Sequence, residues 1–127
     1  MRVTHIITRL VIGGAQENTL ATIRCLRQIP GVEVKLISGP TIGPEGSLEN
    51  EARKIFPEDA AQNFTLVPEL VRPVHPLKDF LALRQLEKLL REQKPYIVHT
   101  PGGKAVILGR LAANRAGVPV IIHHIHG

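Results

Sequence analysis

The chain has 127 residues, of which 43% are apolar and 21% are charged, a composition typical of one globular domain with a sizeable core. Aromatic residues make up 3% of the chain, which disfavours the stacking surfaces that bind single-stranded nucleic acid. The net charge is +5, but no run of five or six basic residues occurs, so we predict no nucleic-acid partner. Apolar runs are too short to span a bilayer. A single cysteine, Cys25, predicts a reducing cytoplasm, and we expect it to be a small buried residue.

The first part of the chain predicts two strands joined by a helix. Residues 2–8 are rich in β-branched side chains and favour a buried strand that runs into a loop. From Ala15 the apolar residues recur at helical spacing, and Pro30 with Gly31 ends the helix. Residues 32–38 alternate apolar and polar side chains and predict the second strand.

The middle of the chain is acidic and predicts shorter elements. Ser47 begins a short acidic helix that ends before Pro57, and residues 64–67 predict a third strand. Three prolines within residues 68–76 predict a connecting loop without regular structure.

The last part of the chain repeats the pattern of strand and helix. Residues 77–94 predict the clearest helix, because apolar residues fall on one face and charged residues on the other. Residues 96–100 predict a strand, residues 105–116 a helix of small and aliphatic residues, and residues 118–122 a fifth strand. The apolar face of the clearest helix consists of Ala82, Leu83, Leu86, Leu89 and Leu90.

This alternation predicts an α/β fold with a Rossmann-like, doubly wound parallel sheet and helices on both faces. In the strand order 3-2-1-4-5, the strands at residues 2–8 and 96–100 are neighbours where the order reverses. Ligands of such folds bind there, outside the carboxyl ends of the strands. Residues 9–14 and 100–104 would then form facing lips of one crevice.

Both lips contain glycines that are candidates for phosphate binding. Gly13 and Gly14 lie between a strand and a helix start, where free backbone amides attract a phosphate, but a tight turn without a ligand fits equally well. The segment from Thr100 to Lys104 has a similar shape without the spacing of an ATPase phosphate loop. It predicts either a loop that binds a phosphate or sugar hydroxyl, or a plain turn.

Histidines are the candidates for acid–base chemistry. His123, His124 and His126 follow the fifth strand, and no nearby acidic residue or cysteine completes a usual ligand set, so we predict no metal. One of these imidazoles is a candidate polar or acid–base group at the crevice, and the alternative is that all three are solvated and idle. His5 and His99 lie inside strands and are expected to be satisfied core or edge histidines.

Several short strings occur in an order that resembles the amino-terminal domain of glycosyltransferase family 4. The resemblance runs over the whole chain and lies in the ordered set, not in any one string. The strings are Ile6–Leu10, Gly13–Gln16, Ser38–Pro40, Ile97–Thr100, Lys104–Ala105, Gly109–Arg110, Ala116–Val120 and His126–Gly127. The resemblance implies one half of a GT-B enzyme that transfers a sugar from a nucleotide-sugar donor to a glycan, lipid or other acceptor. It also implies retention of configuration, a hexosyltransferase type of activity, and no metal or other cofactor.

The resemblance implies roles for individual residues as well. Gly13 and Gly14 would approach the phosphates of the donor, and His126 would be the catalytic residue beside the reacting sugar. The acceptor crevice would be bordered by Arg9, His99, Thr100, Gly102, Gly103 and Lys104.

This chain departs from the family pattern on one lip of the crevice. The family commonly has His-Thr-His-Ser-Ser-Lys-Ala where this chain runs from His99 to Ala105, so one histidine and two hydroxyls are missing. We expect residues 1–127 to be an amino-terminal glycosyltransferase domain that ends early and lacks the nucleotide-sugar domain. Such a chain would transfer no sugar alone, and exposed apolar surface would favour self-association.

Two other functions stay open at the level of sequence. The main alternative is a non-catalytic α/β binding or folding module. A nucleotide-dependent oxidoreductase is disfavoured, because the second strand ends in Ser38–Gly39 and not in an acidic residue. The basic ends of the chain fit an enzyme of polysaccharide biosynthesis that approaches phosphate-bearing acceptors or anionic lipid at the inner face of the membrane.

Overall fold

The computed structural model describes residues 1–7, 14–39, 54–55, 63–70, 76–100 and 104–123. Within these residues, five strands form one parallel sheet in the order β3-β2-β1-β4-β5, which confirms the predicted α/β fold and strand order. The strands are β1 (Arg2–Ile7), β2 (Glu33–Ser38), β3 (Phe64–Leu66), β4 (Ile97–Thr100) and β5 (Val120–His123). The longer helices are α1 (Gly14–Leu26), α4 (Pro76–Gln93) and α5 (Lys104–Arg115).

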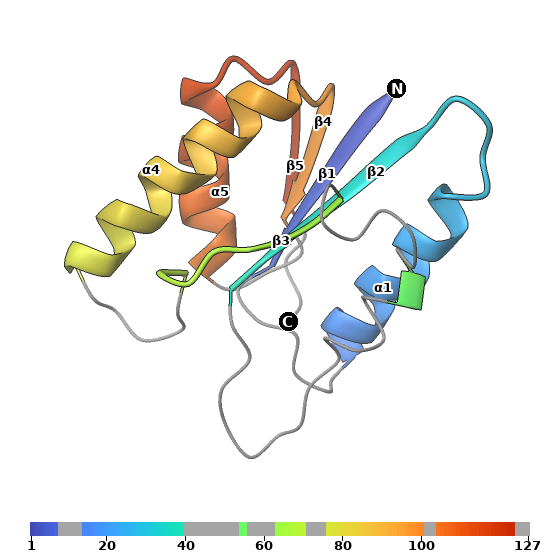
Figure 1. Ribbon diagram of the computed structural model, residues 1–127, viewed down its shortest axis with the longest axis horizontal. Coiled ribbons are helices and arrows are strands. Elements are labelled where there is room, and N and C mark those ends of the chain that lie inside the picture. Colours follow the sequence, from blue (N-terminus) through green and yellow to red (C-terminus); the bar gives the residue numbers. More distant parts are fainter. Residues whose placement is uncertain (8–13, 40–53, 56–62, 71–75, 101–103, 124–127) are drawn as a thin grey trace.

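Helices cover both faces of the sheet, with α1 on one face and the pair α4 and α5 on the other (Figure 1). Successive side chains of a strand point to opposite faces, so each central strand contributes to two separate cores. Ile6 and Ile37 pack in the core beneath α4 and α5. Their neighbours Ile7 and Leu36 pack in the core beneath α1.

Helix α4 presents the predicted apolar face to the sheet. Ala82, Leu86 and Leu90 are buried in the core, and Leu83 and Leu89 are partly buried against it. The helix begins at Pro76, which the sequence assigned to the preceding loop. Proline suits the first position of a helix because its fixed φ is already helical and its missing N–H would have no partner there.

The end of α5 explains why β5 starts later than predicted. Gly117 has a φ of 77°, and its amide donates to the carbonyl of Asn114 at 3.2 Å. The amide of Val118 donates to the carbonyl of Ala113 at 3.0 Å, which completes a Schellman cap. Val118 therefore belongs to the helix cap, and the prediction that β5 starts there was wrong. The strand begins at Val120.

Helix α1 differs from the prediction in two ways. It ends at Leu26, before Pro30, and turns follow it. Cys25 is exposed, so its prediction as a buried residue was wrong. The buried residue Ile23 faces the sheet, and Cys25 lies two positions later, about 200° around the helix axis. Of the predicted acidic helix, the structure describes residues 54 and 55, which are helical.

Gly109 marks the closest approach of α5 to the sheet. A Cβ atom at this position would lie 2.8 Å from Cγ2 of Thr100 and 3.3 Å from Cδ1 of Ile6. Both neighbours are fully buried strand residues, so neither can move aside at low cost. The absence of a side chain at position 109 therefore sets the spacing between α5 and the junction of β1 and β4.

We predict that Gly109→Val lowers the free energy of unfolding by about 1–3 kcal/mol, because the added side chain overpacks this contact. The matched control is Asn114→Val, which places the same side chain on the exposed face of the same helix. This control should change the free energy of unfolding by less than about 0.5 kcal/mol. Urea denaturation measures both, and equal effects of the two substitutions would contradict the proposed packing.

Candidate functional site

The candidate site lies at the carboxyl edge of the sheet, where β1 and β4 are parallel neighbours. The chain leaves β1 for α1 on one face of the sheet and leaves β4 for α5 on the other face. Both helices therefore begin at the same edge, on opposite sides of the β1–β4 junction (Figure 1). Ligands of doubly wound sheets bind at such a reversal of strand order.

The two helix starts differ in how strongly they favour an anion. Free backbone amides and the helix dipole make each start electropositive. Helix α1 begins at Gly14 and carries Glu17 in its first turn, which opposes an incoming anion. Helix α5 begins at Lys104 and has no acidic residue in its first turn. The start of α5 is therefore the more favourable of the two for a phosphate group.

Thr100 ends β4 beside this helix start, but its side chain is turned into the protein. The residue is fully buried, and its hydroxyl donates to the carbonyl oxygen of Ile122 on β5 at 3.5 Å. Its methyl group is the atom closest to the missing Cβ of Gly109. What Thr100 can offer a ligand at this edge is therefore its backbone.

His5 and His99 face each other across the β1–β4 pairing. They are register partners, and their Nδ1 atoms lie 3.0 Å apart. The rings meet edge to face, with centroids 5.0 Å apart and an interplanar angle of 89°. His5 is 2% exposed, and its Nε2 has no hydrogen-bond partner among the described residues. The expectation of satisfied histidines is thus wrong for one ring nitrogen of His5.

Burial lowers the pKa of His5 from 6.5 to about 3, and the neighbouring charge of His99 is the second cause. Removing an imidazolium from water is costly, so the neutral ring is favoured inside the sheet. His99 is half-buried and takes part in a further interaction besides the His5 contact. The pair thus combines a buried ring that stays neutral with a partner nearer the surface.

The structure brings four of the predicted site residues to one edge. Gly14 and Lys104 begin the two helices, and His99 and Thr100 end β4. The other predicted site residues lie outside the described residues, so their roles stay predictions; they are Arg9, Gly13, Gly102, Gly103 and His126. His124 also lies outside, whereas His123 is exposed at the end of β5.

Sequence reasoning missed the contact between His5 and His99. The sequence places each histidine within its strand, but predicting the contact also requires the register between two strands that are distant in sequence.

Sequence reasoning also missed apolar side chains on the outer surfaces of α4 and α5. These side chains lie outside the helix faces that pack on the core. The large exposed apolar residues are Leu77, Phe80, Leu81, Ile107 and Leu111.

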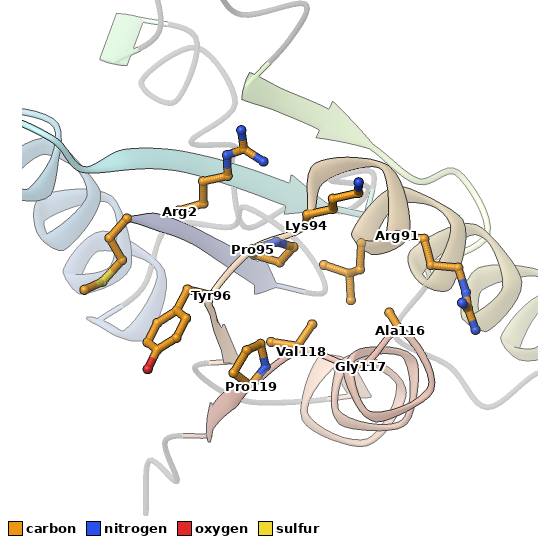
Figure 2. A pocket seen from close by; sticks show the side chains of 11 residues that line it. Arg2, Arg91, Lys94, Pro95, Tyr96, Ala116, Gly117, Val118 and Pro119 are labelled. Carbon is orange, nitrogen blue, oxygen red and sulfur yellow. The ribbon is translucent and has the colours of Figure 1, made fainter.

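A pocket of about 750 Å³ lies at the opposite, amino edge of the sheet (Figure 2). The ends of α4 and α5 line it, together with Tyr96 and the start of β1. Two of its cations are paired, since Arg2 lies 3.3 Å from Glu33 and Arg91 lies 2.9 Å from Glu87, and Lys94 also lines the pocket. The negative ends of two helix dipoles point here, which disfavours an anion.

The described residues contain neither a metal-binding cluster nor a membrane-spanning helix. No group of three or more His, Cys, Asp and Glu side chains in these ranges could hold a metal ion. The prediction that no metal takes part stays a prediction. None of the described helices has the length and apolarity needed to cross a membrane.

Comparisons with known proteins relate this chain to glycosyltransferases. A family model described as a glycosyl transferase 4-like domain matches residues 13–127. Over 70 residues the chain is 46% identical to the UDP-Gal:alpha-D-GlcNAc-diphosphoundecaprenol alpha-1,3-galactosyltransferase of Escherichia coli, covering 55% of this chain and 18% of that protein. Over 52 residues it is 38% identical to the UDP-N-acetylglucosamine--N-acetylmuramyl-(pentapeptide) pyrophosphoryl-undecaprenol N-acetylglucosamine transferase of Yersinia pestis (strain Pestoides F). This match covers 41% of this chain and 15% of that protein.

Solved structures share the fold. MurG of Acinetobacter baumannii superposes with a TM-score of 0.66 and 24% identity, covering 99% of this chain and 36% of that chain. A UDP-GlcNAc 2-epimerase of Methanocaldococcus jannaschii superposes with a TM-score of 0.62 and 18% identity, covering 97% of this chain and 31% of that chain. The matched region is therefore less than half the length of each of these four proteins.

The lowered pKa of His5 predicts a stability that depends on pH. Below pH 6.5 the unfolded chain binds a proton at His5 that the folded chain excludes until about pH 3. The free energy of unfolding should therefore fall on acidification, by up to about 1.4 kcal/mol per pH unit from this residue.

Urea denaturation between pH 6.5 and about 5 tests this, since carboxylates contribute mainly at lower pH. The His5→Asn variant lacks the titrating ring and should show a shallower slope than the wild type. Identical slopes would mean that His5 is protonated in the folded protein.

Proposed function

This chain belongs to the glycosyl transferase 4-like domain family, and we propose that it forms the acceptor-side half of a retaining glycosyltransferase of the hexosyltransferase type. The enzyme would transfer a sugar from a nucleotide sugar to a lipid-linked acceptor in polysaccharide biosynthesis. The bond from the anomeric carbon of the sugar to the nucleotide diphosphate would be exchanged for a bond to an acceptor hydroxyl, with release of the hydroxyl proton. No metal or other cofactor is proposed.

The observation that carries this proposal is the pair of helix starts at the β1–β4 junction. The names of the Escherichia coli and Yersinia pestis relatives both specify a UDP-sugar and a substrate that carries a diphosphate on undecaprenol. Diphosphates are the groups that helix N-termini favour, and the start of α5 is free of acidic residues in its first turn. We therefore assign the α5 side of the crevice to the acceptor diphosphate.

Individual roles follow from this assignment. Gly13 and Gly14 would approach the donor phosphates, and His126 would lie beside the reacting sugar. The acceptor crevice would be bordered by Arg9, His99, Thr100, Gly102, Gly103 and Lys104. A second domain would complete the donor site, so residues 1–127 alone are expected to transfer no sugar.

The outer surface of α4 and α5 supports a further part of the proposal, peripheral contact with an anionic membrane at its cytoplasmic face. Phe80 and Leu81 of α4 are 55% and 42% exposed, and Ile107 of α5 is 64% exposed. Basic residues lie on the same two helices, including Lys78, Arg84, Lys88 and Arg110. Apolar side chains flanked by cations are typical of surfaces that bind anionic lipid, which would bring the site to an acceptor held in the bilayer.

We predict that the full-length protein transfers a sugar from one UDP-sugar in a donor panel to an undecaprenyl-diphosphate-linked sugar, with retained anomeric configuration. Lys104→Ala should raise the acceptor KM by about tenfold or more, because it removes a charge-assisted contact to a phosphate. The matched control is Lys54→Ala, at an exposed lysine away from the crevice, which should leave the KM unchanged. A protein that binds the acceptor without turning over any donor would favour the non-catalytic module instead.

We also predict salt-sensitive binding of the protein to vesicles that contain phosphatidylglycerol. Phe80→Ser should weaken this binding by about tenfold, in line with the free energy of burying one aromatic side chain. The control is Ile29→Ser, because Ile29 is 49% exposed beyond the end of α1, on another part of the molecule. Co-sedimentation measures both variants, and equal binding to vesicles of pure phosphatidylcholine would argue against the electrostatic part of the contact.

A further inference from the structure

A groove of about 980 Å³ lies along the exposed side of α4. Residues of α4 between Phe80 and Glu92 form most of its lining, Glu69 contributes from the segment between β3 and α4, and Arg115 contributes from the end of α5. The lining includes Phe80 and Leu81, two exposed apolar side chains of the surface that we place against the membrane. This α4 groove is therefore part of the same surface.

Glu69 brings a carboxylate without a partner to the α4 groove. Its Oε2 is buried, and among the described residues the side chain forms no hydrogen bond or ion pair. The residue as a whole is half-buried, so the carboxylate is partly removed from water and still borders the groove. An ionised carboxylate can only accept hydrogen bonds, and burial without a donor costs free energy. The donor that satisfies it best is a positively charged one.

The cations of the α4 groove fall into two sets. Glu87 accepts a hydrogen bond from Arg91 at 2.9 Å and lies 3.4 Å from Arg115, so these two guanidinium groups already have an acidic partner. Arg84 and Lys88 form no ion pair among the described residues, and Arg84 acts on Glu87 only at longer range. They lie one helical turn apart on α4, which allows both to reach one anion.

The apolar part of the groove lies next to these available cations. Phe80 precedes Arg84 by one turn, and the guanidinium carbon lies 5.9 Å from the centroid of the Phe80 ring. This cation–π contact keeps the guanidinium beside the exposed ring. Leu81 extends the apolar surface on the neighbouring stripe of the helix. The α4 groove thus combines an apolar contact, an anion-binding contact and a carboxylate that lacks a donor.

These three contacts match the chemistry of phosphatidylethanolamine. Its headgroup joins a phosphate through an ethylene bridge to a primary ammonium, and its acyl chains are apolar. The phosphate would meet Arg84 and Lys88, the ammonium would meet Glu69, and the base of the acyl chains would pack on Phe80 and Leu81. Phosphatidylcholine has the same phosphate, but its methylated ammonium carries no N–H. Phosphatidylglycerol offers hydroxyl groups, which form weaker hydrogen bonds to a carboxylate than an ammonium does.

We propose that the α4 groove is a binding site for a phosphatidylethanolamine headgroup, in which Glu69 selects the primary ammonium. This inference rests on the membrane contact of the proposed function. Arg84 and Lys88 supply a phosphate contact that any phospholipid can use. Glu69 is therefore the residue that determines which headgroup is preferred.

The first test uses vesicles that contain the same fraction of phosphatidylglycerol and differ only in their zwitterionic lipid. Replacement of phosphatidylcholine by phosphatidylethanolamine should strengthen binding of the full-length protein by about fivefold, as expected for a partly exposed charge pair. Glu69→Gln removes the charge at nearly unchanged size and should abolish this preference. The matched control is Glu92→Gln, at an exposed glutamate of the same groove, which should keep it. A general effect of phosphatidylethanolamine on bilayer packing would act on both variants alike.

The second test removes the bilayer. Dihexanoyl phosphatidylethanolamine and dihexanoyl phosphatidylcholine are titrated as monomers into the full-length protein, and the backbone amide resonances around Glu69 and Arg84 are followed by NMR. The ethanolamine lipid should bind more tightly. Arg84→Gln should weaken the response to both lipids, because both carry the phosphate, whereas Glu69→Gln should weaken the response to the ethanolamine lipid alone.

Equal binding of the wild type to the two kinds of vesicle, or a preference that survives in Glu69→Gln, would overturn the headgroup site. So would a dimer that dissociates in Glu69→Gln without lipid, because the α4 groove would then hold a second copy of the chain. Binding of monomeric lipid depends neither on a bilayer nor on sugar transfer. A response to the ethanolamine lipid in a protein that ignores phosphatidylglycerol vesicles would therefore refute the proposed membrane contact and leave the headgroup site intact.

Discussion

The parallel pairing of β1 with β4 is the constraint on which the rest of the structure depends. Because β1 also pairs with β2, both edges of its backbone are satisfied inside the sheet. The crossovers from β1 to β2 and from β4 to β5 run in opposite directions along the sheet, and because such crossovers are right-handed their helices lie on opposite faces. This separates the core under α1 from the core under α4 and α5. The same pairing brings the starts of α1 and α5 to one edge and places His5 level with His99.

The two faces of the sheet at this junction differ in the side chains that they hold. On the α5 side, Ile6, Thr100 and the bare backbone of Gly109 pack so closely that no additional carbon fits. On the opposite side of the sheet, the same two strands hold a pair of histidines with one unsatisfied nitrogen. Dense packing fixes the position of the start of α5, and the histidine pair lies on the other face of the same two strands. The junction thus combines a tightly packed side with a side that holds a buried polar pair.

The sequence predicted the strand order because periodicity and alternation are local properties, as the stripe that contains Leu86 in α4 illustrates. It misplaced the start of β5, because the cap at Gly117 uses hydrogen bonds that continue past the last helical residue. Cys25 was predicted to be buried because cysteine generally is, and its angular position on α1 was not considered. The contact of His5 with His99 depends on the register between strands 94 positions apart, which no local pattern contains. The candidate site follows from topology alone, and its proposed chemistry comes from the family resemblance.

The most direct test of the account is hydrogen–deuterium exchange of the full-length protein with and without a water-soluble analogue of an undecaprenyl-diphosphate-linked sugar. The account predicts slower exchange at the amides that begin α5, around Lys104, because these groups would hold the acceptor diphosphate. Protection confined to the amino-edge pocket, around Tyr96 and Val118, would contradict it. So would binding of the analogue without any protection at the β1–β4 junction.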